Sequence, residues 1–92
     1  MIQSFADDET VAVFLTGTSR RWAGIARVAA RRLQAVDYAS AIADLLKPPG
    51  NRLEKLKGGR DGWWSIRIND QYRVCFRWDG QDAWDVEIVD YH

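Results

Sequence analysis

The chain has 92 residues, 47% of them hydrophobic, and its 13 Lys and Arg balance 13 Asp and Glu to give a net charge of zero. This length fits one domain over residues 1–92, and the neutral total argues against a protein that holds nucleic acid by bulk charge alone. The single cysteine, Cys75, and the single histidine, His92, lack the partners for a disulfide and the spacing of a zinc site, so we expect no metal and no cofactor.

Charge is unevenly distributed along the chain. Residues 1–19 hold three acids and no Lys or Arg, residues 20–60 hold ten Lys and Arg against three acids, and residues 61–92 hold three Arg against seven acids. The basic middle segment favours a local positive surface for phosphates, although solvated surface charge gives the same pattern. The sequence has no leader-like start and no apolar run of membrane-spanning length, so we expect a cytoplasmic protein without membrane contact.

The first half of the chain has the pattern of a short strand followed by helices. Residues 2–5 fit a strand, and the acids at positions 7–9 suit the first turn of a helix that runs to about Leu15 and ends at Gly17. A second helix is predicted because five apolar residues fall on one stripe at about 100° per residue, namely Trp22, Ile25, Ala29, Leu33 and Val36. Its opposite side carries Arg20, Arg27 and Arg31, which suit a solvated surface better than an RNA contact. A short third helix over residues 40–46 should end before the prolines that follow.

The second half has the period-two alternation of strands with one buried face. After the Pro-Pro-Gly sequence at 48–50, four strands are expected, a less regular one at 52–56 and three regular ones at about 63–69, 72–78 and 84–89. Asn69-Asp70 and Asp79-Gly80 are hairpin-turn sequences, so the last three strands form an antiparallel meander. The alternation assigns to the core Trp64, Ile66, Ile68, Tyr72, Val74, Phe76, Trp78, Trp84, Val86 and Ile88.

These elements predict an α+β fold in which helices cover one face of a sheet and the other face stays exposed. The exposed face carries Arg67, Arg73 and Arg77, which is more positive charge than solubility alone requires. Trp63 shares this face, where its ring either stacks on an RNA base or caps the sheet. Cys75 lies between two of the arginines with no base beside it in the sequence, and we interpret it as a small strand residue.

The chemistry open to this chain is limited by its single histidine, because a histidine pair cannot serve as acid and base. RNA cleavage fits that restriction, since the substrate supplies its own nucleophile, the ribose 2′-OH, and the protein needs only to move protons and stabilise charge on the phosphate. Lys and Arg side chains stabilise such charge, and Arg presents two parallel donors to phosphate oxygens.

Three segments carry a family resemblance: PPGNRLEKLKGGRDG at 48–62, WSIRINDQYRVCFRW at 64–78 and VEIVDYH at 86–92. With the opening IQSF and the length, they make the whole chain similar to the HigB-type branch of the RelE/ParE toxin superfamily, toxins of bacterial type II toxin–antitoxin systems. The resemblance implies a microbial-RNase-like RelE fold in the order β-α-α-β-β-β, with the last three strands a meander. It also implies a metal-independent endoribonuclease, an mRNA interferase that cuts messenger RNA in the ribosomal A site and so inhibits translation and growth.

The resemblance implies roles for individual residues. Lys57 matches the catalytic lysine of the LKG motif, and Arg73 matches the sheet arginine that contacts the scissile phosphate. The catalytic trio of the family corresponds to Asp90, Tyr91 and His92, with the histidine as acid or base. Further RNA-binding candidates, near this site or on the exposed sheet face, are Arg60, Arg67, Arg77 and Trp63.

Two features depart from what the resemblance implies. Gly59 stands where the family has an Asp after LKG, which removes a carboxylate near Lys57. The strand alternation also places Asp90 and His92 on the core side. Either the strand ends or bulges near Val89, since an offset of one residue reverses every side chain's face, or the site lies at the sheet edge; we expect the former.

The resemblance also implies partners. These are a cognate helix-turn-helix antitoxin of the HigA type, the ribosome with its messenger RNA, and operator DNA contacted only through the toxin–antitoxin complex. Two alternatives stay open: a ParE-type toxin that shares the fold but inhibits DNA gyrase, and an inactive protein retained as an antitoxin-binding co-repressor. Lys57 and the DYH sequence favour the nuclease over both.

Overall fold

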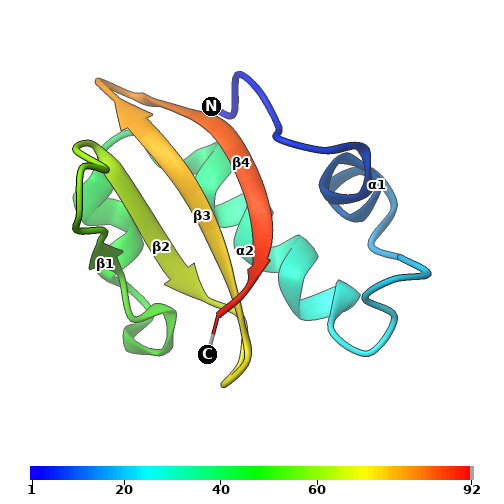
Figure 1. Cartoon of the computed structure of the whole chain (residues 1–92). Helices are drawn as coiled ribbons and strands as arrows, with labels where there is room; N and C mark the ends of the chain where they lie inside the picture. The colour runs from blue at the N-terminus through cyan, green and yellow to red at the C-terminus, as the bar shows by residue number, and fades with distance from the viewer. Residues whose placement is uncertain (92) are drawn as a thin grey trace.

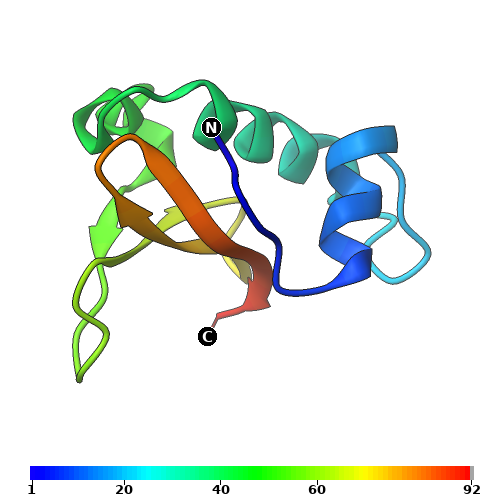
Figure 2. The same ribbon diagram turned by 90° about the horizontal axis from the view of Figure 1, so that it is seen from above.

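The structure, a computed structural model that describes residues 1–91, consists of two α-helices on a four-stranded antiparallel sheet (Figure 1). The helices are α1 (Asp8–Thr16) and α2 (Ala26–Tyr38), followed by the 3-10 helices η1 (Ile42–Leu46) and η2 (Pro49–Asn51). The strands, in sheet order, are β1 (Glu54–Lys55), β2 (Trp63–Arg67), β3 (Tyr72–Asp79) and β4 (Asp82–Asp90). Helix α2 runs along one face of the sheet and α1 lies beyond β4 (Figure 2). The predicted α+β class and strand meander are confirmed.

Helix α1 ends at Gly17 as the sequence predicted, whereas Asp7 lies just before the first turn rather than in it. The Asp7 carboxylate accepts a hydrogen bond of 2.7 Å from the backbone N–H of Thr10, so Asp7 caps the helix, and two acids follow in the first turn. At the other end Gly17 has a φ of 71°, in the left-handed region that glycine adopts at low cost, and its N–H donates to the Val13 carbonyl. The helix therefore begins and ends close to its predicted bounds.

Helix α2 begins later than the apolar stripe predicted. It starts at Ala26, and Trp22 and Ile25 lie in the turn before it, where the Trp22 N–H donates to the Ser19 hydroxyl over 3.0 Å. Gly24, a weak helix former, interrupts the pattern there. Trp22 is nevertheless buried and packs in the core from the turn. The other three residues of the stripe, Ala29, Leu33 and Val36, are buried in α2 as predicted. Ile25 lies just before the helix.

The predicted strands at the two margins of the sheet are shorter than expected. Residues 2–5 form two isolated parallel bridges to β4 rather than a strand. Strand β1 covers only Glu54–Lys55 of the expected 52–56. Arg52 has a φ of 44°, which departs from extended geometry and delays the strand. The short helix η1 ends at the predicted residue but has 3-10 rather than α geometry.

Both hairpin turns form close to their predicted positions. The Asn69 side-chain oxygen accepts a hydrogen bond of 2.8 Å from the Tyr72 N–H, so this residue supports the turn between β2 and β3. The second turn falls one residue later than predicted, because Asp79 pairs with Asp82. Gly80, with a φ of 65°, takes the first turn position, which requires a left-handed backbone.

A β-bulge in β4 reverses the predicted position of Trp84. The register shifts between the Cys75–Glu87 pair and the Arg77–Trp84 pair, so two residues of β4 face one of β3. Asp85 in this bulge has a φ of 53°. Trp84 consequently shares the face of Arg77, whose guanidinium carbon lies 5.6 Å from the Trp84 ring centroid. The prediction that Trp84 packs in the core is wrong, because strand alternation fails across a bulge.

The core lies between the helices and the inner face of the sheet. Its fully buried side chains include Val13, Leu33, Val36, Leu45, Ile66, Val74, Phe76 and Val86. Trp64 and Trp78 are partly buried and pack against this core, as predicted. Across residues 1–91, no helix is both long enough and apolar enough to cross a membrane.

Candidate active site on the outer face of the sheet

The outer face of the sheet, which we define as the face turned away from α2, has small residues between two carboxylates. Strand pairing aligns a central row of four residues from β1 to β4, namely Glu54, Ser65, Cys75 and Glu87. Ser65 and Cys75 in the middle are buried, whereas Glu54 is exposed and Glu87 is half-buried. Short side chains in the middle and longer ones at both ends leave a hollow over the sheet.

A pocket of about 730 Å³ occupies this hollow. It is lined by Glu54, Lys55, Leu56, Lys57, Arg60, Cys75, Glu87, Val89 and Tyr91. One wall comes from β1 and the loop that follows it, and the opposite wall comes from β4 and the residue after it. Lys57, Arg60 and Tyr91, three of the predicted site residues, therefore meet in one pocket. The volume lies in the usual range for small-ligand sites, so a nucleotide fits.

Arg73 is held beside this pocket by four contacts. Its Nη1 donates to the Ser65 hydroxyl over 3.0 Å and to the Arg52 carbonyl over 3.3 Å. Its Nη2 lies 3.6 Å from Oε1 of Glu54, and its guanidinium carbon lies 5.1 Å from the centroid of the Tyr91 ring. The Arg73 side chain is only 12% exposed. An arginine fixed in this way presents its donors in a defined direction.

The outer face is less open than the sequence predicted. The Arg73 side chain contacts Ser65, and its ion pair with Glu54 connects β3 to β1 across the intervening strand. Ser65, which the guanidinium contacts, is fully buried. Strand alternation indicates which face a residue occupies, but it does not indicate whether a longer neighbour covers that residue.

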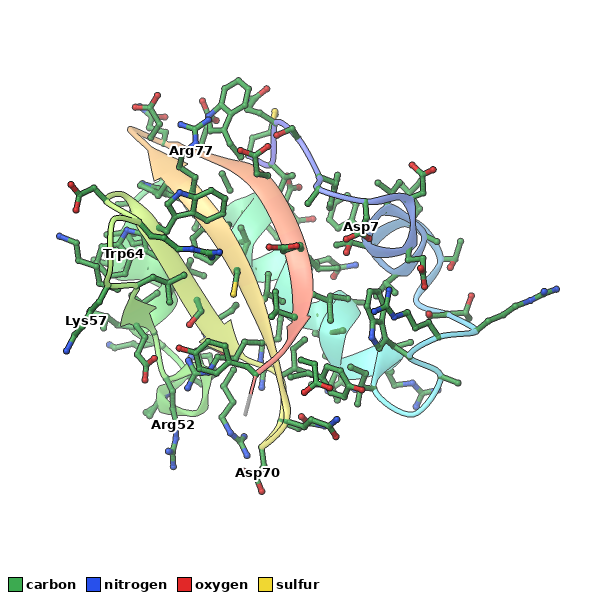
Figure 3. All side chains as sticks on the ribbon, in the orientation of Figure 1. Asp7, Arg52, Lys57, Trp64, Asp70 and Arg77 are labelled. Carbon is green, nitrogen blue, oxygen red and sulfur yellow. The ribbon has the colours of Figure 1, made fainter. Side chains whose placement is uncertain are left out.

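Lys57 and Arg60 come from the loop between β1 and β2. Gly58 and Gly59 have φ values of 75° and 81°, so the chain turns between the two cations with a backbone that favours glycine. Lys57 lies at the β1 edge of the sheet (Figure 3). The Arg60 guanidinium carbon lies 5.5 Å from the centroid of the Trp63 ring, a cation–π contact. This contact joins the loop to β2.

Strand β4 continues past the point where we predicted its end. It stays paired as far as Asp90, which lies opposite Tyr72, and the Tyr91 N–H then donates to the Gln71 carbonyl over 2.6 Å. The irregularity that we expected near Val89 is instead the bulge earlier in the strand. Alternation through the end of β4 therefore sends Asp90 and Tyr91 to opposite faces.

The predicted catalytic trio is not gathered in the pocket as a unit. Tyr91, which is 42% exposed, lines the pocket and stacks on Arg73. Asp90 is not part of the pocket lining, and its Oδ2 accepts a hydrogen bond of 3.2 Å from Nε2 of Gln71. His92 lies outside the described residues, so its predicted place beside the cations stays a prediction.

The other predicted RNA-binding residues lie outside the pocket lining. Arg67 hydrogen-bonds Asp70, and this bond holds the pKa of the Asp70 carboxyl below its usual value. The Nε of Arg77 lies 3.8 Å from Oδ2 of Asp85. Trp63 lies opposite Arg77 on the neighbouring strand β2. Figure 3 shows Arg77 and Asp70 toward opposite ends of β3. These cations flank the pocket and are partly neutralised by neighbouring acids.

Two ionisable groups of the central row have raised pKa values. Burial raises the pKa of the Cys75 thiol to about 11, and the Glu87 carboxylate adds to the rise. The thiol therefore stays largely protonated at neutral pH, in keeping with the interpretation of Cys75 as a small strand residue. Burial also raises the pKa of Glu87, Asp7 acts in the same direction, and Arg60 opposes them.

Three polar residues of the site were not singled out from the sequence: Glu54, Ser65 and Glu87. Alternation placed Ser65 and Glu87 on the outer face but gave no reason to assign them a role. Glu54 belongs to a strand too short to have a clear pattern. The strand register is the signal that identifies them, because the two hairpin turns align Ser65, Cys75 and Glu87 in one row.

Comparisons with known proteins agree on one family. A family model described as the RelE-like toxin of the type II toxin–antitoxin system HigB matches residues 3–92. Toxin HigB-1 of Vibrio cholerae is 54% identical over 48 residues, 52% of this chain and 50% of that protein. Endoribonuclease HigB of Proteus vulgaris is 39% identical over 61 residues, 66% of this chain and 65% of that protein. These matches thus span half to just under two thirds of the relatives' own lengths.

A solved structure shares the fold. A chain of the YoeB-YefM complex from Staphylococcus aureus matches with a TM-score of 0.57 and 17% sequence identity, covering 100% of this chain and 98% of that chain. At this identity the likeness concerns the fold alone. Together with the family match, it confirms the predicted RelE-like fold.

Proposed function

Because the chain belongs to the HigB-like family of RelE-like toxins of type II toxin–antitoxin systems, we propose that it is an endoribonuclease that cuts messenger RNA. The observation that carries the proposal is the meeting of Lys57, Arg60 and Tyr91 in one pocket, with Arg73 fixed against Tyr91. Cations around a hollow of nucleotide size suit a phosphodiester, whose negative charge they offset. The relative named Endoribonuclease HigB supports the same conclusion.

In this proposal the RNA supplies the nucleophile. A basic group, His92 in this proposal, takes the proton of the ribose 2′-OH, the 2′-oxygen bonds to the adjacent phosphorus, and the bond to the 5′-oxygen of the next nucleotide breaks. Lys57 and Arg73 stabilise the charge on the pentavalent phosphate, and an acid gives a proton to the leaving oxygen. The products carry a 2′,3′-cyclic phosphate and a 5′-OH, and no step uses a metal.

The fixed position of Arg73 supports its proposed role at the phosphate. Ser65 and Tyr91 hold the guanidinium, so little side-chain entropy is lost when a phosphate binds. Glu54 occupies one donor of the same guanidinium, and a phosphate must share or replace that contact. Beyond the pocket, Arg67, Arg77 and Trp63 are proposed to contact the flanking RNA.

We further propose that cleavage takes place in the ribosomal A site. A net charge of zero gives the chain little long-range attraction for free RNA, so positioning by the ribosome supplies what bulk charge does not. A cognate helix-turn-helix antitoxin is the proposed inhibitor, and operator DNA is bound through that complex. The similar solved structure is a YoeB-YefM complex, which supports a protein partner.

The test is a purified translation system with a defined message, in which new 5′ ends are mapped. We expect cuts at codons in the A site with 5′-OH ends. Arg73→Ala and His92→Ala should slow cleavage by about 10²–10³-fold each. Arg27→Ala, on the exposed side of α2, is the control and should cut at the wild-type rate.

Other outcomes would identify the alternatives. Wild-type cleavage by both variants would rule out the residue assignment. An uncut message with inhibited supercoiling by gyrase would identify a ParE-type toxin. An uncut message with active gyrase and retained antitoxin binding would identify an inactive co-repressor.

A further inference from the structure

The pocket contains a carboxylate that the proposed chemistry does not use. Glu87, on β4, is half-buried in the pocket lining. Within residues 1–91, no hydrogen bond or ion pair engages its side chain, whereas the other pocket carboxylate, Glu54, is paired with Arg73. A carboxylate that is partly removed from water without a hydrogen bond costs stability, and the attraction of Arg60 in the same pocket offsets only part of that cost. Its position in a pocket suggests that a ligand supplies the partner.

The strand register separates Glu87 from the phosphate-binding end of the pocket. Glu87 lies opposite Cys75, whereas Arg73 lies opposite Val89, one pair further along the outer face. Successive residues on one face of a strand are about 7 Å apart. A phosphate held by Arg73 therefore lies some distance from Glu87, whose negative charge would repel it. The end of the pocket near Glu87 suits an uncharged part of the RNA.

The pocket lining also has apolar and aromatic surface that fits a nucleobase. Val89 and Leu56 give the pocket apolar surface, and Tyr91 adds an aromatic ring. Unpaired RNA bases are bound by packing against such side chains and by hydrogen bonds along their edges. The pocket of about 730 Å³ has room for a base beside the phosphate and ribose.

We propose that Glu87 is a specificity-determining residue that accepts a hydrogen bond from the amino group of a base next to the cleaved bond. The inference rests on the proposed ribonuclease function. Adenine, cytosine and guanine all carry an exocyclic amino group that a carboxylate can accept from. Uracil offers one N–H between two carbonyl oxygens, which face the carboxylate oxygens unfavourably. Uracil is therefore the base that Glu87 disfavours.

The experiment compares cleavage profiles of wild type, Glu87→Gln and Glu87→Ala in a translation extract with many messages. In the wild type, uracil should be under-represented at one position beside the cut. Glutamine has the same shape but brings an amide that donates to uracil carbonyls, so Glu87→Gln should raise uracil at that position by about 5-fold or more. Glu87→Ala should flatten the preference among the four bases.

Controls keep the result interpretable. Glu9→Gln makes the same change on the exposed surface of α1 and should leave the profile unaltered. Thermal unfolding of each variant verifies that it is folded. The readout is the share of cuts at each base within one variant, so a change in the overall rate of Glu87→Gln does not enter the comparison.

Two results would overturn the inference. An unaltered profile in both variants would show that Glu87 does not read a base. A uniform loss of cleavage at every site would assign Glu87 to proton transfer instead. If the wild-type protein cuts no message, both the proposed function and this inference are wrong. If the wild type cuts message and the variants have the same profile, only the inference is wrong.

Discussion

The Arg73 guanidinium lies over the Tyr91 ring, with 5.1 Å between its central carbon and the ring centroid. The contact joins β3 to the residue that follows β4, and Ser65 and Glu54 engage the same guanidinium from β2 and β1. Residues from every strand region of the sheet thus determine the direction of one side chain. Such preorganisation lowers the cost of binding a phosphate.

Replacement of Arg73 by lysine tests how much the fixed, planar guanidinium contributes to cleavage. Arg73→Lys keeps the positive charge but loses the planar pair of donors and the stack on Tyr91. We expect cleavage to slow by at least about 10-fold, approaching the loss seen when a charge-stabilising donor is removed. Single-turnover cleavage of ribosome-bound message measures the effect, with Arg27→Lys on α2 as the matched control. A wild-type rate for Arg73→Lys would mean that charge alone suffices.

Glu54→Gln should release Arg73 from a competing carboxylate. The Glu54 side chain is 52% exposed, so losing its ion pair should cost less than about 1 kcal/mol of unfolding free energy. Affinity for an uncleavable RNA with a 2′-deoxy nucleotide at the cut should rise a few-fold, because the phosphate no longer competes with Glu54. Urea unfolding and RNA titration measure the two effects. Weaker binding would indicate that Glu54 orients Arg73 rather than competing with its ligand.

Cys75 should resist alkylation in the folded protein. Its thiol is buried and its pKa is raised to about 11, so little thiolate is present at pH 8. We expect iodoacetamide to modify Cys75 at that pH only after urea is added, as followed by mass spectrometry. Cys75→Ser should cut message near the wild-type rate. Rapid modification without urea would contradict the burial of the central row.

The ionisation of Glu87 should lower stability as pH rises. Burial raises the pKa of Glu87, so the folded chain binds this proton more tightly than the unfolded chain. The contribution is fully present below the unfolded pKa of 4.5 and is lost as pH rises through the folded pKa. Glu87→Gln should therefore be more stable than the wild type at pH 7, with the difference shrinking toward acid pH. Urea unfolding across pH measures it, and a less stable variant at pH 7 would contradict it.

Substitutions of Asp85 measure the backbone strain in the bulge of β4. Both Asp85→Gly and Asp85→Ala lose the ion pair with Arg77. The difference between their free energies of unfolding therefore reflects the backbone strain at a φ of 53°. We expect the alanine variant to be less stable than the glycine variant by about 1 kcal/mol, because an L side chain is strained in the left-handed region. Urea unfolding of the pair provides the comparison. Equal stabilities would show that the bulge relaxes at no cost.

Local chemistry made much of the fold predictable from the sequence. The cap at Asp7 and the left-handed Gly17 bound α1, and Asn69 forms the first hairpin turn. These signals act within a few residues of the chain, so they need no knowledge of the tertiary structure. The late start of α2 escaped prediction, because Trp22 occupies the core from a turn as well as it would from a helix.

The site was less predictable because it depends on contacts across strands. The position of Trp84 changed with a bulge whose residue, Asp85, has no strong sequence signal for a left-handed backbone. Lys57, Arg73 and Tyr91 were identified by resemblance, and the structure brings Lys57 and Tyr91 to one pocket with Arg73 stacked on Tyr91 beside it. Glu54 and Glu87 emerge only once the register is known, since each lies at an end of the central row.

The first six residues of the chain cover the β4 edge of the sheet. Between Met1 and Ala6, the backbone exchanges hydrogen bonds of 2.8–3.1 Å with Ala83 and Val86 along β4. The opposite margin, β1, is only two residues long and both are charged. A growing fibril adds strands where a sheet presents a long stretch of unpaired backbone, and neither margin presents one. Two short segments thereby protect the fold against self-assembly into cross-β aggregates.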